Sequence, residues 1–218
     1  MQASSGKTFK NYSRVLLIGH SGSGKTHLII NILKHHAELF ESPIKGVVWV
    51  AGVQAMPSIF LNIPIRKIQV NDDIEEIVSS KEISDHIVIL DDLQFQADRL
   101  INDIFCKYSR HLKYHVFVMQ QTMFGNTRFS RSISLNANYL IIFRNRRDQR
   151  QINILASQLL PSNTKFILDA YKKATNFHYG YLFIDLSVDS SEILRYKGNI
   201  IPGDFPLQVF IPLKTAAL

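Results

Sequence analysis

Short apolar runs recur along the chain and alternate with longer segments of helical periodicity. Six runs rich in β-branched and aromatic residues are typical of buried strands. They cover residues 14–18, 46–51, 66–70, 86–90, 115–119 and 139–143. Residues 25–40 and 92–108 instead repeat apolar side chains at helical spacing. Buried strands that alternate with helices predict an α/β fold with a mostly parallel sheet covered by helices on both faces.

The pattern changes after residue 145. Helical patterns cover 148–160 and 163–173 and are separated by Pro161, and strand-like runs follow at 180–186 and 207–212. We therefore expect a small C-terminal α/β extension on the same sheet. The expected organisation is an N-terminal tail over 1–12 and one domain over 13–218, with a core at about 13–160 and an extension at about 161–218.

Composition narrows the class of protein. A chain of 218 residues suits one α/β domain. Its one cysteine, Cys106, excludes a disulfide framework and a cysteine-based zinc site. The sequence has no signal peptide and no apolar stretch near the roughly 18 residues that a membrane span needs. We expect a soluble, intracellular protein with no membrane segment.

The net charge of +7 is concentrated in one part of the chain. Residues 94–150 carry 10 basic and 3 acidic side chains, whereas 1–93 carry 9 and 10, and 151–218 carry 6 and 5. Such a stretch is either a solvated basic face or a surface that meets phosphates. Those phosphates would belong to nucleic acid or to a neighbouring subunit's nucleotide.

A phosphate-binding motif opens the first helical segment. The sequence GHSGSGKT matches G-x-x-x-x-G-K-[ST] in full and follows the apolar run at 14–18. Its glycines let backbone N–H groups cradle phosphates at a helix N-terminus. We expect Lys25 to reach the terminal phosphates and the Thr26 hydroxyl to complete a Mg²⁺ shell. The predicted ATP-binding residues are Gly19, His20, Ser21, Gly22, Ser23, Gly24, Lys25 and Thr26.

Two carboxylates follow the apolar run at 86–90. At the end of a strand, Asp91 would hold Mg²⁺ through water, and Asp92 would orient or deprotonate the attacking water. An Asp–Asp pair after a strand also suits a plain helix N-cap. The neighbouring phosphate motif favours the functional interpretation.

Spacing separates the classes of nucleotide-binding protein. Asp91 lies 66 positions after Lys25, and two predicted strands lie between them. This leaves room for a strand inserted between the phosphate-motif strand and the carboxylate strand, as in RecA/ASCE-like motor and helicase ATPases. No N-K-x-D element for a GTPase is present. A nucleotide kinase stays open as an alternative, although such kinases usually act as monomers and have no use for a basic belt. Gln121, after the run at 115–119, is either a γ-phosphate sensor or a loop residue.

With these motifs the chain resembles viral genome-packaging ATPases of the FtsK/HerA superfamily. It is most similar to the poxvirus-type branch found in Maverick/Polinton elements, adintoviruses and virophages. The resemblance is carried by GHSGSGKT, VILDDLQF, YSRHLKYHVFVMQQTMF, SLNANYLIIFRNRRDQRQINILASQLLP and YGYLFIDL. It implies a P-loop NTPase fold and a homo-oligomeric ring that uses ATP to push double-stranded DNA into a capsid. The implied partners are DNA and a capsid or portal vertex, in the infected host cell or the virion.

The resemblance also implies roles for individual residues. Lys25 and Thr26 match the P-loop positions, and Asp91 matches the metal-holding carboxylate. Asp92 stands where many superfamily members carry Glu, and Gln121 matches the polar sensor.

In such rings an arginine of one subunit completes its neighbour's site. Arg110 is the first candidate for this finger and Arg147 is the second, with Arg128 and Arg131 as alternatives. Arg128 and Arg131 are also the candidate contacts to the DNA backbone.

Three functions are consistent with these features. The leading hypothesis is a packaging motor for double-stranded DNA. A helicase or a conjugation-type DNA pump of the same superfamily is the second hypothesis. The third is a scaffold that binds ATP as an assembly switch, which the Asp91–Asp92 pair disfavours because a pure binder needs no water-activating carboxylate.

Overall fold

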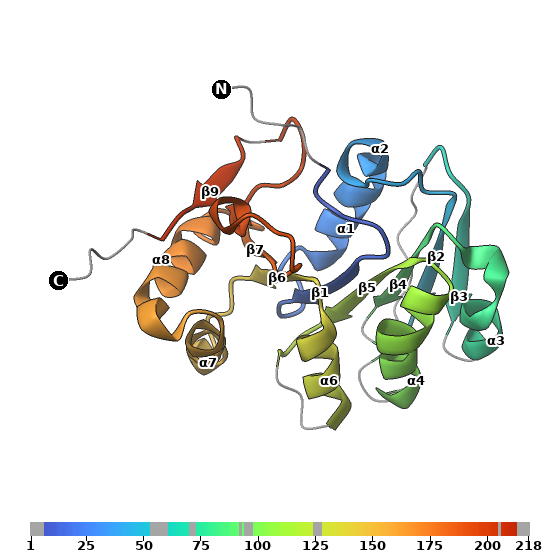
Figure 1. Ribbon diagram of the computed structural model, residues 1–218, viewed down its shortest axis with the longest axis horizontal. Helices are drawn as coiled ribbons and strands as arrows, with labels where there is room; N and C mark the ends of the chain where they lie inside the picture. Colours follow the sequence, from blue (N-terminus) through green and yellow to red (C-terminus); the bar gives the residue numbers. More distant parts are fainter. Residues whose placement is uncertain are drawn as a thin grey trace.

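One nine-stranded sheet organises the fold, with strands in the order β3-β2-β4-β5-β1-β6-β7-β8-β9 (Figure 1). The computed structural model describes residues 7–52, 61–69, 73–91, 93, 98–123, 128–204 and 206–212. Neighbouring strands from β3 to β6 pair in parallel, and β7, β8 and β9 continue the sheet in antiparallel pairing. The strands are β1 (Arg14–Ile18), β2 (Gly46–Ala51), β3 (Ile65–Gln69), β4 (His86–Asp91), β5 (His115–Gln120), β6 (Tyr139–Phe143), β7 (Tyr181–Asp185), β8 (Tyr196–Gly198) and β9 (Gln208–Phe210).

Helices cover both faces of the sheet, as expected. Figure 1 shows α1 and α2 on one face and α3, α4 and α6 on the other. The helices of the described residues are α1 (Lys25–Lys34), α2 (His36–Leu39), α3 (Ile74–Ser79), α4 (Asp98–Asp103), α5 (Ser109–His111), α6 (Arg128–Asn136), α7 (Gln149–Leu159) and α8 (Thr164–Ala174). A π-helical segment (Ile104–Tyr108) joins α4 to α5, and short 3₁₀ turns lie at Lys81–Ile83, Pro161–Asn163 and Glu192–Leu194.

The strands bury both of their faces, which explains their continuous apolar sequences. In β4, Ile87 and Ile89 pack in the core that contains α1, while Val88 and Leu90 pack in the core that contains α8. Successive side chains of a strand point to opposite faces, so a strand between two helical layers needs apolar residues at every position. The sheet thus separates two hydrophobic cores.

The strand order places the carboxyl ends of β4, β5 and β1 side by side. β5 lies between β1 and β4, so the sheet has an inserted strand, as expected, although the spacing between Lys25 and Asp91 is not its source. Neither of the two strands between Lys25 and Asp91 in the sequence is that insert, because β2 and β3 lie beyond β4. The inserted strand is the one that precedes Gln121.

Several predicted helices differ in their bounds. The pattern at 25–40 forms two helices, because the backbone of His35 (φ −103°, ψ 23°) departs from helical geometry and ends α1. Within the 92–108 pattern, Leu93 is buried but not helical, and the described helix begins with α4. The patterns at 148–160 and 163–173 correspond to α7 and α8, whose first turns are capped by Asp148 and Asn163. The short elements α3, α6 and β8 have no counterpart among the predicted segments.

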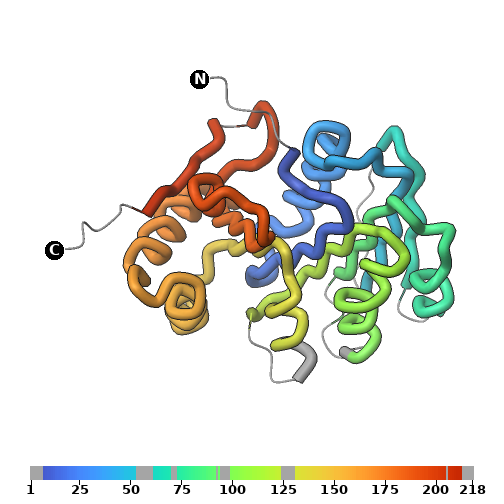
Figure 2. Tube along the Cα trace, in the orientation of Figure 1, coloured from blue at the N-terminus to red at the C-terminus, as the bar shows by residue number. Residues whose placement is uncertain are grey.

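Residues 7–12 belong to the expected N-terminal tail, and Phe9 among them packs in the core. Phe9 is fully buried and stacks on Phe40, with ring centroids 4.9 Å apart. It also makes edge contacts with Phe117 and Tyr139. The backbone of Phe9 forms hydrogen bonds with the chain at the end of α2. Figure 2 shows the N-terminal segment running beside the first helices. The first strand of the core therefore begins from an anchored segment.

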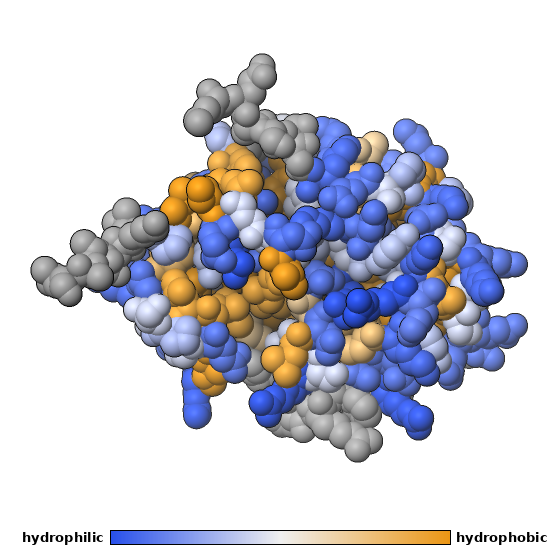
Figure 3. All heavy atoms as spheres, in the orientation of Figure 1, coloured by the Kyte–Doolittle hydropathy of each residue, from blue (hydrophilic) through white to orange (hydrophobic). Residues whose placement is uncertain are grey.

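The surface differs between the two ends of the sheet. Figure 3 shows apolar residues gathered over the C-terminal elements, and a largely polar surface over α3 and α4. Exposed apolar side chains of the C-terminal elements include Ile193, Leu194 and Ile211. Among the described helices, none has the length and apolar character that crossing a membrane requires.

A buried histidine makes stability depend on pH. His115 is 1% exposed, and its Nδ1 accepts a hydrogen bond from the Ser13 N–H (3.1 Å). Burial lowers the pKa of His115 to about 4, from an ordinary value of 6.5. Between these values the unfolded chain binds more protons, so the free energy of unfolding should fall by about 3 kcal/mol as pH drops from 6.5 to 4.

Urea unfolding at several pH values measures this loss. His115→Asn is the matched variant, since its Oδ1 can accept the Ser13 hydrogen bond and does not titrate. The variant should show a smaller loss of stability over the same range. Equal losses in the two proteins would contradict a titrating role for His115.

Candidate nucleotide-binding site

The loop between β1 and α1 has the backbone that its glycines allow. Gly22 and Gly24 have φ values of +75° and +104°, in the left-handed region that favours glycine. Gly24 is the N-cap of α1, and a Cβ there would come within 2.8 Å of the Tyr179 ring. The first N–H groups of α1 have no partner within the helix and form an anion-binding end.

Lys25 is folded back over this loop. Its Nζ donates hydrogen bonds to the carbonyl oxygens of Gly19 and His20, the second at 3.1 Å. The ammonium group is therefore held at the loop, where it can contact the phosphates of a nucleotide.

The carboxyl ends of β1, β4 and β5 meet at one cavity of about 240 Å³. It brings together the side chains of Lys25, Thr26, Asp91 and Gln121, beside the backbone of the glycine loop. Asp91 is the last residue of β4 and pairs with Met119 of β5, which places it next to the strand that leads to Gln121. Ligands bind at this edge of open α/β sheets.

The donor set of this cavity fits Mg²⁺. The Thr26 hydroxyl and the Asp91 carboxylate are hard oxygen donors, which Mg²⁺ prefers. Among the described residues no group of three His, Cys, Asp or Glu side chains could form a metal site. Mg²⁺ needs no such cage, because one or two carboxylates and the substrate's phosphates suffice. Asp92, the predicted base, lies outside the described residues.

Arg110 lies near the amino ends of the parallel strands, opposite to the carboxyl ends that form the phosphate cavity. It is exposed in α5, just before β5 begins, close to Arg14 at the start of β1. Burial and the nearby positive charge of Arg110 lower the pKa of Arg14. The five residues of β1 span roughly 16 Å, so Arg110 does not reach the phosphate cavity of its own chain.

Other arginines lie closer to the glycine loop. Arg147 is exposed in the loop after β6, and its backbone N–H donates to Asn145 Oδ1 (2.9 Å). Its neighbours Arg144 and Arg146 line a cavity of about 470 Å³ with His20 and Gly22. Sequence reasoning missed these two residues, because the pairing of β6 with β1 that brings them to the glycine loop is seen only in the fold.

The candidate DNA contacts lie on another element. Arg131 is exposed on α6. Arg128 begins the same helix, and its side chain lies outside the described part of the structure.

Sequence reasoning also missed an aromatic segment between α8 and β7. Tyr179 lies against Gly24 and borders the phosphate cavity. Its ring centroid is 5.7 Å from that of His27 in α1 and 3.9 Å from that of His178. Only the fold brings this segment to the phosphate motif.

The inserted strand, the glycine loop and the cavity at the strand ends define a P-loop NTPase fold. No family model matches the sequence, and no curated protein matches it. Solved structures do match. The genome-packaging NTPase B204 from Sulfolobus turreted icosahedral virus 2, in complex with sulfate, superposes with a TM-score of 0.54 and 15% identity. The match covers 93% of this chain and 98% of that chain.

Two further structures agree. The same NTPase in complex with ATP-gammaS matches with a TM-score of 0.53 and 15% identity, over 93% of this chain and 99% of that chain. B204, the DNA-packaging ATPase from Sulfolobus turreted icosahedral virus, matches with a TM-score of 0.54 and 14% identity over 93% and 98%. The fold is thus shared along almost the whole chain.

Proposed function

We propose that this protein is an ATP-hydrolysing motor that translocates double-stranded DNA into a viral capsid. The observation that carries the proposal is the cavity where Lys25, Thr26, Asp91 and Gln121 meet. The full-length likeness to a genome-packaging NTPase that was solved with ATP-gammaS and AMPPCP supports it. On the quoted motifs we place the protein in the poxvirus-type branch of the FtsK/HerA superfamily.

Each of the site residues has a different role in ATP hydrolysis. Lys25 neutralises charge on the terminal phosphates, and Thr26 and Asp91 would hold Mg²⁺. The metal would supply further charge neutralisation at the phosphates when bound. Gln121 donates a hydrogen bond to the γ-phosphate. Asp92 orients the attacking water and accepts its proton.

The position of Arg110 supports a ring of identical subunits. An arginine at the amino edge of the sheet cannot complete its own site, but it can face the phosphate cavity of a neighbour. There it would stabilise the charge that develops on the γ-phosphate. Arg147 is the second candidate for this role. The ring would act at a capsid or portal vertex.

Double-stranded DNA would contact the basic stretch through its phosphates. Arg128 and Arg131 are the proposed contacts. Phosphate contacts carry no sequence information, which suits a motor that must move any genome segment.

ATP hydrolysis with and without DNA tests this function. Double-stranded DNA should raise the turnover of the wild-type protein, and added salt should weaken this stimulation because phosphate contacts release counterions. The Lys25→Ala protein shows the background from contaminating ATPases. Turnover that no DNA affects would contradict the motor. Stimulation by single strands alone would favour the helicase alternative.

A further inference from the structure

Two arginines lie close together near the amino ends of the parallel strands. Arg14 is the first residue of β1, and Arg110 lies in α5, just before β5. Arg14 and Val116 are partners in the ladder between β1 and β5. The Tyr114 N–H donates to the Ser109 carbonyl (3.1 Å), which ties α5 to the start of β5. Burial and the positive charge of Arg110 both lower the pKa of Arg14.

The side chain of Arg14 lies on the face of the sheet that carries Arg110. Successive side chains of a strand point to opposite faces, so Arg14 and Leu16 share a face. Leu16 packs in the core with Ile104 of the π-helical segment and Ile133 of α6. The π-helical segment continues directly into α5. Both guanidinium groups therefore belong to the same side of the molecule.

Hydrogen bonds restrain Arg14. Its backbone N–H and its Nε both donate to Asn138 Oδ1, at 3.1 and 3.2 Å. The Asn138 N–H in turn donates to the Arg14 carbonyl (2.8 Å). The side chain is half-buried, whereas that of Arg110 is exposed. A side chain held in one conformation loses less entropy when it binds a ligand.

This pair of cations has no carboxylate partner in the part of the chain that the structure describes. The ion pairs found there involve other side chains. Asn138, which binds Arg14, is neutral. Two like charges held near each other repel, and burial removes part of the hydration of Arg14. An anion between them would relieve both costs, and the planar guanidinium fits the oxygens of a phosphate group.

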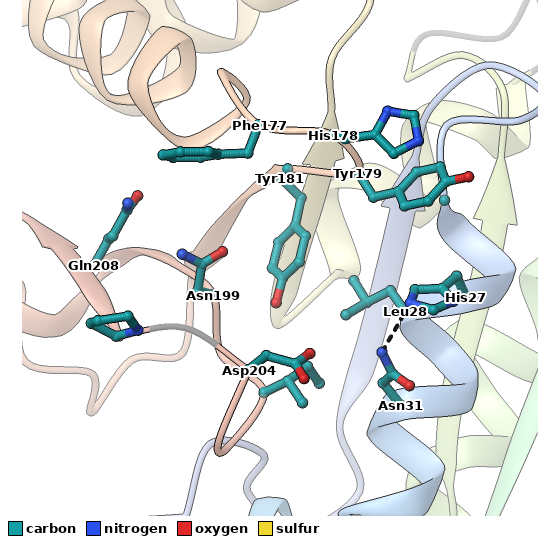
Figure 4. Close-up of a pocket in the computed structure, with 14 residues that line it drawn as sticks. His27, Leu28, Asn31, Phe177, His178, Tyr179, Tyr181, Asn199, Asp204 and Gln208 are labelled. Carbon is teal, nitrogen blue, oxygen red and sulfur yellow. Dashed lines mark hydrogen bonds between the residues drawn. The ribbon is translucent and has the colours of Figure 1, made fainter.

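The phosphate cavity contributes little positive charge of its own. Lys25 is the one lysine or arginine among its described lining residues. The cavity that adjoins it along α1 has no lysine or arginine among its described lining residues (Figure 4). Cations placed where charge develops on the γ-phosphate stabilise the transition state. In the proposed ring, the arginines at the amino edge of a neighbouring subunit can supply them.

We infer that Arg14 and Arg110 bind the terminal phosphates of a neighbouring subunit's ATP as a pair. Arg14 is the restrained member, which sets the position of the phosphate, and the exposed Arg110 closes on it. The inference rests on the proposed function, because it takes ATP to lie on the P-loop of an adjoining subunit. It adds a second cation, from the strand that precedes the P-loop, to the single finger proposed above.

Turnover without DNA tests Arg14. Arg14→Gln removes the charge and keeps an amide that can bond to Asn138. It should lower kcat by roughly 10²- to 10³-fold, the usual cost of one positioned electrostatic donor, and leave ATPγS binding intact. Arg66→Gln is the matched control, since Arg66 is exposed on the edge strand β3, and it should turn over normally. Normal turnover of Arg14→Gln would overturn the inference. So would loss of the stimulation by DNA alone, because the pair would then bind DNA phosphates.

Asn138→Asp separates the charge of Arg14 from a structural role. Aspartate keeps both hydrogen bonds to Arg14 and neutralises its guanidinium group. If Arg14 only held the start of β1 in place, the stronger bond would leave turnover unchanged, and this result would overturn the inference. If its charge acts on the neighbour's ATP, kcat should fall, by less than in Arg14→Gln.

Mixed rings show which subunit Arg14 serves. A Lys25→Ala subunit has both arginines and can complete the intact cavity of an Arg14→Gln neighbour, so co-expression should restore part of the activity. A mixture of Arg14→Gln and Arg110→Ala should stay inactive, because every amino edge then lacks one arginine.

Two results of these mixtures would overturn the pair. No recovery in the first mixture would mean that Arg14 acts within its own chain, and recovery in the second would mean that the two arginines act separately. A wild-type protein that does not hydrolyse ATP, with or without DNA, would instead overturn the proposed function itself.

Discussion

Replacing Lys25 with alanine should lower the kcat for ATP hydrolysis by roughly 10²- to 10³-fold, the usual cost of removing one positioned electrostatic donor. The ammonium group lies on the glycine loop, within hydrogen-bond distance of the Gly19 and His20 carbonyls. A nucleotide would meet that positive charge where its terminal phosphates lie. Steady-state phosphate release at saturating ATP measures the effect.

Lys34→Ala is the matched control for this change. Lys34 is an exposed lysine in the last turn of the same helix, far from the phosphate cavity. Its loss should cost at most about 1 kcal/mol of helix-dipole stabilisation and leave turnover unchanged. A Lys25→Ala protein that keeps more than about a tenth of the wild-type rate would contradict the role of this lysine.

Arg110→Ala should abolish most turnover while leaving ATP binding intact, with a loss of about 10³- to 10⁵-fold if it acts as a finger. The physical reason is its place at the amino edge of the sheet, away from the cavity that holds Lys25 and Asp91. Its charge can stabilise the transition state only in a neighbouring subunit. ATPγS binding and ATP turnover of the same preparation separate the two effects.

Mixed rings test this action between subunits. A Lys25→Ala subunit keeps its arginine and can complete the intact cavity of an Arg110→Ala neighbour. Co-expression of the two inactive proteins should therefore restore part of the activity. Lys107→Ala, an exposed cation one helical turn earlier, is the control and should turn over normally. Normal turnover of Arg110→Ala would show that the finger assignment is wrong and direct the search to Arg147.

The geometry of the glycine loop was largely predictable because it depends on consecutive residues. Eight consecutive residues supply the glycines, the lysine and the hydroxyl, and the glycines allow the positive φ values of Gly22 and Gly24. The place of Asp91 at the end of a strand was predictable because a short run of β-branched and aliphatic residues before it is typical of a buried strand. The alternation of strands and helices predicted a parallel sheet, which the structure confirms.

Features that depend on long-range packing were not predictable. The sequence pattern indicated an inserted strand but not its identity, because strand order depends on the crossover connections. Phe9 was counted with the tail because a single phenylalanine has no periodicity to mark it as core. Arg144 and Arg146 could not be distinguished from their basic neighbours by composition.

By itself, the sequence determined the P-loop, the places of its lysine and hydroxyl, the strand that ends at Asp91 and the class of fold. These depend on backbone preferences and strand-length hydrophobic runs, which act over a few residues. Only the tertiary structure decided which edge of the sheet carries Arg110 and which aromatic ring rests on Gly24. The Tyr179 segment reaches the P-loop because α8 and β7 pack on the same sheet as β1, and such a contact between distant segments has no local signature.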